Sequence, residues 1–213
     1  DNLVWEDNFK GSSLDTNFWN IYVGNGCPEL CGFGNHELQY YKSDSSNLVV
    51  KNGYLEVVAK LPNAVGTWPA IWLLPSLDRN LNWPLDGEID IMENVGYDSC
   101  KILGTIHTKA YNHTINTQKS DSIVISTAHQ DFHTYSLNWT DSLLEWYVDS
   151  NLYNSIKRKS TDREEQWPFN KPFHLIINQA VGGDWGGRKG VDTTSFPQSL
   201  IIKRVKLYNK KPY

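Results

Sequence analysis

The stretch DGEIDIMENVG, residues 86–96, sets acidic side chains among apolar ones. Glu88 and Asp90 alternate with isoleucines, as expected of a strand with one face in a core, because successive side chains of a strand point to opposite faces. Glu93 falls out of this alternation by one residue. A β-bulge at 91–92 would add the one residue that returns Glu93 to the face of the other two acids. The stretch therefore predicts a bulged strand with three carboxyl groups on one face and apolar residues packed behind them.

The remainder of the chain repeats the strand pattern. Short runs rich in Val, Ile, Tyr and Phe alternate with clusters of Gly, Asn, Asp, Ser and Pro, and no helix-length amphipathic pattern appears. Residues 160–165 fit a single capped helical turn. Many short strands with turns between them predict an all-β sandwich of two sheets. The expected strands are Leu3–Phe9, Leu48–Ala59, Ala70–Leu74, Glu88–Glu93, Ile102–Thr108, Ser122–Ser126, His133–Trp139, Leu143–Val148, Leu152–Ser155, Phe173–Ala180 and Leu200–Tyr208.

Length and charge limit the class of protein. The 213 residues show no linker, repeat or low-complexity segment, so we expect one domain over residues 1–213. The net charge of −4 argues against nucleic acid as a partner, because there is no basic surplus to neutralise phosphates. No apolar run is long enough to cross a membrane. The chain begins at Asp1 rather than Met, which a removed signal peptide or a recombinant expression vector would explain.

Two residue types narrow the class further. Three cysteines leave one thiol over in any fully paired scheme. Cys27 and Cys31 are near enough in sequence to close a small loop, although a free, buried cysteine is at least as common an outcome. Nine Trp and eleven Tyr make the chain rich in aromatic residues. Because Trp needs a partner for its N–H and is rarely fully buried, several indoles should be exposed, where they suit the faces of sugar rings.

Three carboxyl groups in a row are costly to hold, and that cost suits catalysis. Neighbouring carboxylates repel one another, so at least one of them should have a raised pKa. Cleavage of a glycosidic bond with retention needs two carboxyl groups about 5–5.5 Å apart, one as nucleophile and one as acid. In a flat strand Glu88 and Glu93 would lie about 13 Å apart at Cα even with the bulge, so the strand should curve across a concave face.

A metal site and a solvated acidic face are the alternatives to a catalytic row. A hard cation prefers more oxygen ligands in an irregular loop, whereas these acids lie in an apolar strand. A solvated face would not explain the break in the alternation. We therefore expect Glu88, Asp90 and Glu93 to be catalytic, with no metal site and no cofactor.

The acidic stretch and five other segments together resemble glycoside hydrolase family 16. EIDIME is similar to the bulged, laminarinase-type form of the family's Glu-x-Asp-x-x-Glu signature. The resemblance runs from about Leu3 to the C-terminus, and the Trp-Pro-Ala-Ile-Trp stretch makes it specific. The other segments that resemble endo-β-1,3-glucanases of this family are GNHELQYY (34–41), GTWPAIWLLP (66–75), IHTKAYNHT (106–114), FHLIINQAVGGDWGG (173–187) and FPQSLIIKRVKLY (196–208).

The resemblance implies a β-jelly-roll sandwich of two curved antiparallel sheets with a substrate groove on the concave side. Glu88 matches the family nucleophile, Glu93 the acid/base, and Asp90 the helper that hydrogen-bonds the nucleophile. The implied reaction is endo-acting, retaining hydrolysis of β-1,3-glucan (laminarin), with mixed-linkage β-1,3-1,4-glucan as a further substrate. The expected partner is thus a β-glucan polysaccharide or oligosaccharide, bound by a secreted, monomeric enzyme.

The resemblance also implies positions that contact sugar. Trp68, Trp72 and Trp83 match positions where the family stacks sugar on the donor side of the cleaved bond. His107 either resembles an active-site histidine of the family or is an ordinary sheet histidine with satisfied hydrogen bonds. Trp185 either closes over acceptor sugars or packs its own loop onto the sheet. The hydrogen-bonding positions of the family fall near Asn35, Glu37, Asn178 and Gln179.

The sequence departs from the family in two places. The chain runs on directly after Lys60, where the family has about two more strands, so the donor-side wall should be altered and a sheet edge opened. Many relatives bind calcium on the convex face, but the matching positions here are Asn8 and Lys203, and an ammonium group has no lone pair for a cation. We expect Lys203 to form an ion pair with Glu6 or Asp7 instead.

Other activities fit the same fold. A non-catalytic β-glucan-binding protein usually lacks one of the catalytic acids, and here all three are present. A transglycosylase mostly carries the unbulged signature, so the extra Met92 speaks against it. Hydrolysis of a galactan such as agar or carrageenan shares the bulged signature, although the Trp-containing segments look more like those of glucanases. A structural interaction module would leave the acidic strand unexplained.

Overall fold

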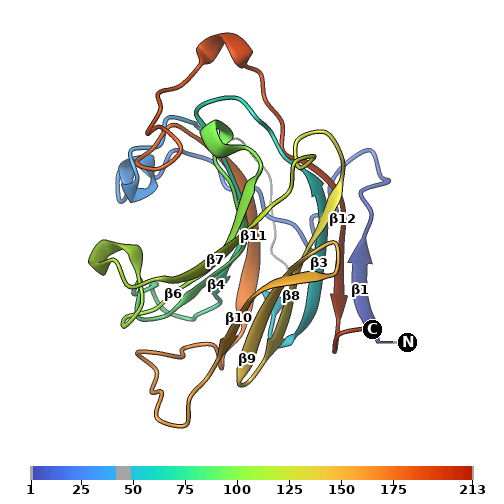
Figure 1. Cartoon of the computed structure of the whole chain (residues 1–213), viewed down its shortest axis with the longest axis vertical. Helices are drawn as coiled ribbons and strands as arrows, with labels where there is room; N and C mark the ends of the chain where they lie inside the picture. Colours follow the sequence, from blue (N-terminus) through green and yellow to red (C-terminus); the bar gives the residue numbers. More distant parts are fainter. Residues whose placement is uncertain (1, 42–48, 213) are drawn as a thin grey trace.

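The computed structural model describes residues 2–41 and 49–212. Two six-stranded antiparallel sheets pack face to face, and one of them is strongly curved, with a concave side (Figure 1). The helices within these ranges are the short 3₁₀ turns η1 (Cys31–Gly34), η2 (Gly96–Asp98), η3 (His113–Ile115) and η4 (Thr193–Ser195). None of the described helices is long and apolar enough to cross a membrane. The all-β sandwich of two curved sheets that the sequence predicts is therefore confirmed.

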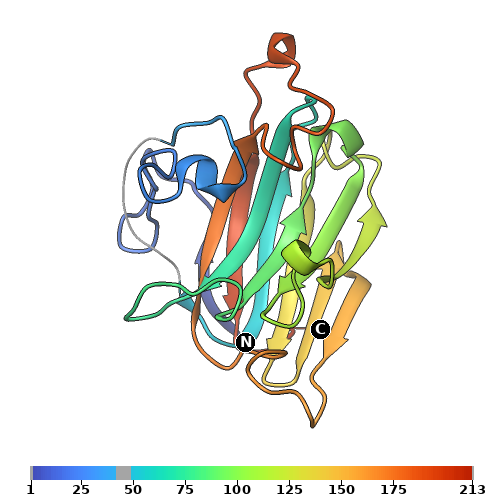
Figure 2. The ribbon, with the colours of Figure 1, turned by 90° about the vertical axis from the view of Figure 1, so that its left-hand side faces the viewer.

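The strands are divided between a concave sheet and an outer sheet. Figure 2 looks toward the open side of the concave sheet, which the segments around η1 and η3 flank. In spatial order the concave sheet contains β2 (Val49–Val50), β11 (Phe173–Val181), β4 (Thr67–Pro75), β5 (Glu88–Glu93), β6 (Lys101–His107) and β7 (Lys119–Val124). The outer sheet contains β1 (Leu3–Asp7), β12 (Ile201–Tyr208), β3 (Gly53–Lys60), β8 (His133–Thr140), β9 (Leu143–Val148) and β10 (Asn151–Lys157).

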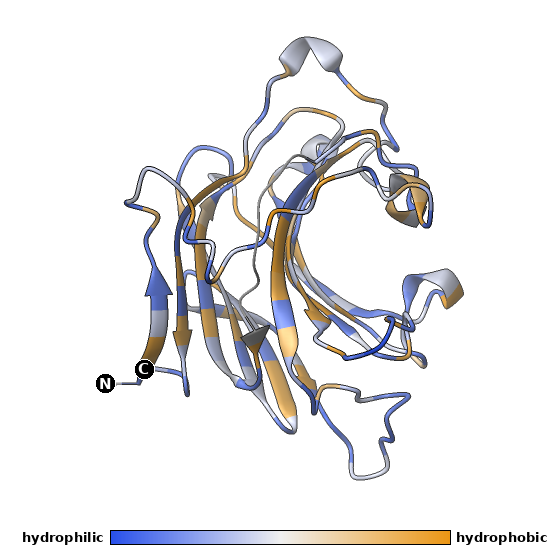
Figure 3. Cartoon of the chain, turned by 180° about the vertical axis from the view of Figure 1, so that it is seen from behind, coloured by the Kyte–Doolittle hydropathy of each residue, from blue (hydrophilic) through white to orange (hydrophobic). Residues whose placement is uncertain are grey.

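The core lies between the two sheets, where alternate residues of both meet. Ile71, Ile89 and Ile106 of the concave sheet and Tyr135 and Trp146 of the outer sheet are fully buried there. Hydrophobic and hydrophilic bands follow one another along the strands, as expected where one face of a sheet is buried (Figure 3). Each large apolar side chain that is buried contributes about 1.5–3 kcal/mol. This burial fixes which face of each strand of the curved sheet lies on its concave side.

The expected strand Leu48–Ala59 is wrong. It is two strands in different sheets, β2 and β3, and Leu48 lies outside the described residues. The chain changes sheets at Asn52 and Gly53, whose φ angles of 57° and 111° lie in the left-handed region. A Cβ at Gly53 would lie 2.3 Å from the carbonyl oxygen of Tyr208, so only glycine fits. The Asn-Gly pair is a turn signal that the apolar runs on either side of it conceal.

The helical turn expected over residues 160–165 is also wrong. Separate turns replace it, with hydrogen bonds from Asp162 N to Lys159 O (3.0 Å) and from Gln166 N to Arg163 O (3.0 Å). The Asp162 carboxylate accepts a hydrogen bond from Lys159 N at 2.8 Å. A short acidic side chain that bonds to the backbone in this way offers an alternative to the helix.

The ion pair expected of Lys203 is not formed. Its ammonium lies over the ring of Phe132, 5.3 Å from the ring centroid, as a cation–π contact. Glu6 pairs instead with Lys206 at 3.6 Å, because the pairing of β1 with β12 places these two residues directly opposite each other. Asp7 accepts a hydrogen bond from a tryptophan indole at 2.7 Å.

The concave sheet is short on the β2 side. In the described part of the chain, β2 pairs with β11 through two residues, opposite Phe173 and His174. The other end of β11 is met by the segment 37–39, where Leu38 N donates to Val181 O at 2.8 Å. The altered wall that the sequence predicts after Lys60 concerns the end of β3 in the outer sheet, and its effect on substrate binding stays a prediction.

Candidate active site

The bulge predicted in β5 is confirmed. Asp90 pairs opposite Thr105 and Glu93 opposite Leu103, so β5 advances by three residues where β6 advances by two. The extra step lies at residues 91–92, whose side chains are buried in the core. Both glutamates of the row remain partly exposed on the other face. The bulge therefore brings the third carboxyl group onto the concave face, as the broken alternation predicts.

The outer sheet satisfies the backbone that the bulge leaves unpaired. The indole N–H of Trp146 on β9 donates to the carbonyl of Asp90 at 2.7 Å. The hydroxyl of Tyr153 on β10 donates to the carbonyl of Ile91 at 3.4 Å. Gly104, across from the bulge on β6, leaves room for both donors, since a Cβ there would lie 2.5 Å from the Trp146 ring and 2.6 Å from the Tyr153 hydroxyl.

Each glutamate of the row accepts a hydrogen bond from its own indole. Trp83 Nε1 donates to Glu88 Oε2 at 2.9 Å, and Trp68 Nε1 donates to Glu93 Oε1 at 3.0 Å. Trp83 precedes β5 by a few residues, whereas Trp68 belongs to the adjacent strand β4. These bonds orient the two carboxyl groups and favour their ionised forms.

Burial raises the pKa of all three acids. For Glu88 and Asp90, repulsion within the row adds to the effect of burial. Asp90 is 2% exposed and its pKa is raised well above the ordinary value, and its hydrogen bond with Glu88 lowers the pKa of that neighbour. The row therefore carries fewer than three negative charges at neutral pH, and the expectation that at least one pKa is raised is confirmed.

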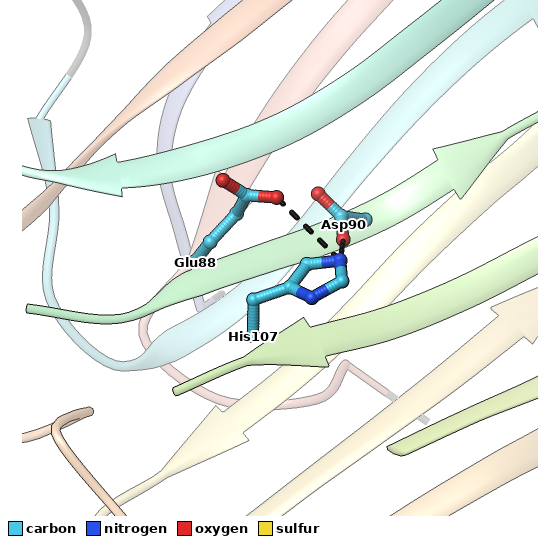
Figure 4. Close-up of side chains that lie close together, drawn as sticks. All are labelled: Glu88, Asp90 and His107. Atoms are coloured by element: carbon cyan, nitrogen blue, oxygen red, sulfur yellow. Dashed lines mark ion pairs between the residues drawn. The ribbon is translucent and has the colours of Figure 1, made fainter. Parts of the chain in front are cut away.

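His107 lies directly opposite Glu88 in the pairing of β5 with β6 (Figure 4). Its Nε2 is 3.4 Å from Asp90 Oδ2 and 3.7 Å from Glu88 Oε1. Burial, and then the nearby His113, lower the pKa of His107 to about 4, so the ring is neutral at working pH. The structure thus places His107 among the acids, and these three side chains are also the donor set that could hold a metal ion.

The four tryptophans expected to contact sugar lie in different parts of the concave face. Trp68 meets Trp185 edge to face, with ring centroids 5.5 Å apart, beside the acid/base candidate. Trp83 lies on the nucleophile side, against the ring of His113 at 5.1 Å. Trp72 donates its indole N–H to the Asn178 side chain at 2.8 Å. Their roles in stacking sugars stay predictions.

The polar residues expected to bind sugar are only partly brought together. Asn35 donates to the Glu37 carboxylate at 3.3 Å, and both approach Gly183 near the Trp68–Trp185 pair. Asn178 lies on the concave face and donates to the Tyr41 hydroxyl at 2.9 Å. Gln179, the next residue along β11, lies on the core side with Ile177, because neighbouring side chains of a strand face opposite ways.

Sequence reasoning did not identify the ion pair that holds the loop carrying Trp83. Asp86 is 1% exposed and accepts hydrogen bonds from Arg79 Nη1 and from Asn82 N, both at 2.7 Å. The ammonium of Lys171 lies 3.6 Å away. The hydrogen bonds from Arg79 are the main reason that the pKa of Asp86 falls to about 2. The signal was available, because a buried acid needs a cationic partner and Arg79 is seven residues away.

The arrangement can supply an acid and a nucleophile to one bond. Glu88 and Glu93 project from the same strand onto a concave surface, and Glu88 feels the charge of Glu93. Asp90 lies between them, and its proton stabilises the carboxylate of Glu88 by a hydrogen bond. Two carboxyl groups with different partners are the requirement for protonating a leaving group and attacking the carbon it leaves.

Comparisons of sequence and fold agree with this chemistry. The model of glycosyl hydrolases family 16 matches residues 35–197. A β-glucanase of Rhodothermus marinus is 41% identical over 97% of this chain and 84% of its own. The X-ray structure of the laminarinase from Rhodothermus marinus superposes with a TM-score of 0.87 at 38% identity, covering 97% of this chain and 96% of that one.

A second solved structure is similar over an equal span. SCLam, a non-specific endo-β-1,3(4)-glucanase from family 16, superposes with a TM-score of 0.86 at 35% identity, covering 98% of this chain and 91% of that one. The family model and these relatives cover the bulged acidic strand, the tryptophan-rich strand β4 and the strand β11 that carries Asn178. The chain belongs to glycosyl hydrolases family 16.

Proposed function

We propose that the chain is an endo-acting β-1,3-glucanase that cleaves laminarin-type glucans with retention of configuration. The observation that carries this proposal is the bulged row of Glu88, Asp90 and Glu93 on the concave sheet, with an indole N–H on each glutamate. Relatives named laminarinase and β-glucanase match nearly the whole chain in sequence and fold. The retaining mechanism is general to this family.

The first step transfers the glucan to the enzyme. The reactive form carries the proton on Glu93, whose pKa is raised by burial, and Glu93 gives this proton to the glycosidic oxygen. Glu88, as carboxylate, attacks the anomeric carbon, and the bond to the leaving sugar breaks. The hydrogen bonds of Glu88 with the Trp83 N–H and with Asp90 favour its ionised form against the effect of burial, and the Trp83 N–H orients the carboxylate. The step ends with a glycosyl ester on Glu88 and a released acceptor-side fragment.

The second step returns the enzyme to its starting state. Glu93, now ionised, takes a proton from water, and the oxygen of that water attacks the same anomeric carbon and frees Glu88. The Trp68 N–H stabilises the charge on Glu93 in this interval. Two inversions at one carbon leave the configuration unchanged. His107 stays neutral throughout and adds no competing positive charge beside Glu88.

Mixed-linkage β-1,3-1,4-glucan is the second substrate that we propose. SCLam, which is described as non-specific between the two linkages, supports this extension. Reducing-sugar release and product sizes from laminarin, mixed-linkage β-glucan, agarose and carrageenan would test both substrates. We expect rapid cleavage of laminarin to short oligosaccharides. Cleavage of a galactan alone would keep the mechanism and change the substrate, whereas laminarin binding with no release from any of them would make the chain a binding protein.

Glu88→Ser tests the nucleophile directly. We expect kcat to fall by at least about a thousandfold while laminarin binding is nearly intact, because the nucleophile acts mainly in the transition state. Glu165→Gln, which alters an exposed carboxyl group paired with Lys109, is the matched control and should be fully active. Turnover near wild type in Glu88→Ser would exclude Glu88 as the nucleophile.

Azide rescue separates the two glutamates. With an aryl β-glucoside carrying a good leaving group, azide should restore turnover to Glu88→Ala and give the α-glycosyl azide. The same treatment of Glu93→Ala should give the β-glycosyl azide, because there azide attacks the glycosyl ester on Glu88. The opposite pairing of variants and products would exchange the proposed roles.

We also propose that the protein acts outside the cell as a monomer. The Cys27–Cys31 disulfide supports an oxidising compartment, and Cys100 is left free. A polysaccharide substrate supports the same location, since such chains do not enter cells intact. Activity in the culture medium of the native host tests secretion. Light scattering should give a mass near 24.4 kDa, and twice that value would reject the monomer.

A further inference from the structure

We infer that Glu88, Asp90 and His107 form a binding site for a divalent transition ion of the zinc type, and that this ion inhibits the enzyme. The three side chains come from β5 and β6, and each offers one ligand atom, all within 4.8 Å of one another (Figure 4). Inhibition rests on the proposed role of Glu88 as nucleophile. Binding of the ion rests on the geometry of the three side chains.

The spacing of the ligand atoms suits a zinc ion. His107 Nε2 lies 3.4 Å from Asp90 Oδ2 and 3.7 Å from Glu88 Oε1. A tetrahedral zinc ion with bonds of about 2.0–2.2 Å holds its ligands about 3.3–3.6 Å apart. The two separations that involve the histidine are therefore already close to the required length.

A buried oxygen without a partner points into this site. Asp90 Oδ2 makes no hydrogen bond with the described part of the chain, although Asp90 is only 2% exposed. It faces His107 Nε2, and no hydrogen bond is made across the 3.4 Å between them. His107 Nδ1 is likewise without a partner in the described residues, so its ring is free to present the Nε2 lone pair. A cation between these atoms would supply the partner that Asp90 Oδ2 lacks, and its binding would release the proton of Asp90 to the solvent.

The donor set favours transition ions over the common hard cations. Calcium takes six to eight oxygen ligands, and magnesium favours octahedral oxygen with several waters. One imidazole nitrogen with two carboxylate oxygens suits zinc and its neighbours in the transition series. The Glu88 side chain is 16% exposed, so an ion can reach the site from the concave face. Water would complete the coordination on that side.

A bound ion would block catalysis by a simple route. It would engage the carboxylate lone pair that Glu88 directs at the anomeric carbon, and it would occupy the surface on which the sugar is cleaved. Ion and glucan therefore exclude one another. Inhibition should be competitive with glucan and reversed by a chelator.

Calorimetric titration with zinc chloride, in a buffer that does not bind zinc, tests the site without reference to activity. We expect one ion per chain, and no heat from calcium or magnesium chloride. His107→Gln should weaken zinc binding at least about tenfold, because losing a ligand costs more than losing an outer-shell partner, which itself costs 10–100-fold. His113→Gln is the matched control, since its ring lies 5.0 Å from that of His107 but outside the donor set.

Surface histidines offer the competing explanation. His36→Gln removes an exposed histidine that lies 2.9 Å from Asp184, and it should leave zinc affinity unchanged. Absence of zinc binding, or loss of binding in His36→Gln or His113→Gln but not in His107→Gln, would overturn the inference. Glu88→Gln alters another member of the donor set, so the test remains possible if His107→Gln does not fold. With a chelator present, the melting curve of Glu88→Gln near pH 5 should match that of wild type.

Kinetics with laminarin then separates this inference from the proposed function. The zinc concentration that halves the rate should rise in proportion as laminarin is raised above KM. Zinc that binds through His107 without slowing hydrolysis would overturn the inhibition and, with it, the role of Glu88. Normal hydrolysis with no zinc binding would overturn the inference alone and leave the glucanase assignment intact.

Discussion

At the scale of single residues, the two glutamates that we propose as nucleophile and acid/base differ in what they contact. Glu88 receives hydrogen bonds from Trp83 and from the proton of Asp90, and both favour its ionised form. Glu93 receives the Trp68 N–H alone among these donors, and burial is the main cause of the raised pKa of both glutamates. The same residue type thus has two different environments on one strand, as a nucleophile and an acid require.

Trp83→Phe and Trp68→Phe should shift opposite limbs of the pH profile. Loss of the Trp83 N–H raises the pKa of Glu88, which acts when ionised, so the acidic limb of kcat/KM should move to higher pH by about 0.5–1 unit. Loss of the Trp68 N–H raises the pKa of Glu93, which acts when protonated, so the basic limb should move to higher pH. Steady-state rates from pH 4 to 10 would show this. Movement of the same limb in both variants would contradict the assignment.

At the scale of elements, the β5 bulge depends on a gap in β6 and on donors from the outer sheet. Gly104 provides the gap, and Trp146 fills it with its indole N–H on the carbonyl of Asp90. Asn154 on β10 also donates to the Gly104 carbonyl at 2.9 Å. The bulge is therefore fixed from behind by side chains of β9 and β10.

Gly104→Ala should destabilise the protein by about 1–3 kcal/mol and reduce kcat together. The added methyl would push the indole of Trp146 away, leaving the buried carbonyl of Asp90 unpaired. Urea unfolding and laminarin hydrolysis on the same preparation would measure both effects. Gly11→Ala in the exposed N-terminal loop is the control and should stay within about 0.5 kcal/mol of wild type. A fully active and stable Gly104→Ala would show that the bulge does not need this gap.

The loop between β4 and β5 depends on the buried ion pair of Asp86. Asp86→Asn should lower the free energy of unfolding by about 1–3 kcal/mol, because Arg79 loses charge-assisted hydrogen bonds. The loosened loop should release Trp83 from Glu88, so the acidic limb of the pH profile should move upward as in Trp83→Phe. Lys109→Gln, at an exposed pair, is the control for an ordinary surface ion pair. Lost stability with an unmoved acidic limb would show that the ion pair does not position Trp83.

At the scale of the whole molecule, the row of three buried carboxyl groups makes stability depend on pH. The folded state raises the pKa of all three buried acids, so between their ordinary and raised values it binds more protons than the unfolded chain. This contribution to stability is full below about pH 4 and is lost as pH rises through the raised pKa values. Glu88→Gln cannot ionise and should therefore be more stable than wild type by roughly 1–2 kcal/mol at pH 8.

Urea unfolding at pH 5 and pH 8 would measure this difference, which should shrink at the lower pH. Glu165→Gln is the control, because this exposed carboxyl group has its pKa lowered rather than raised, chiefly by its hydrogen bond with Lys109. A stability gain in Glu88→Gln that is as large at pH 5 as at pH 8 would point to packing rather than charge.

Local features, such as the strands and the bulge, could be predicted from the sequence, whereas contacts between distant segments could not. The bulge followed from Glu93 standing one residue out of phase, and the strands followed from their alternation. Trp146 and Tyr153, which hold the bulge, lie 56 and 62 residues from the carbonyls they satisfy, so no spacing rule reaches them. Gln179 is different, because the alternation of β11 already excludes it from the face of Asn178.

The hydrogen bonds from the outer sheet to the β5 bulge also bear on how the protein fails when heated. The carboxyl row keeps its shape only while the two layers stay in register across the core. A molecule whose layers have begun to separate retains strands but loses the geometry of Asp90, and with it the nucleophile beside it. We therefore expect heat to abolish activity in step with the separation of the two sheets.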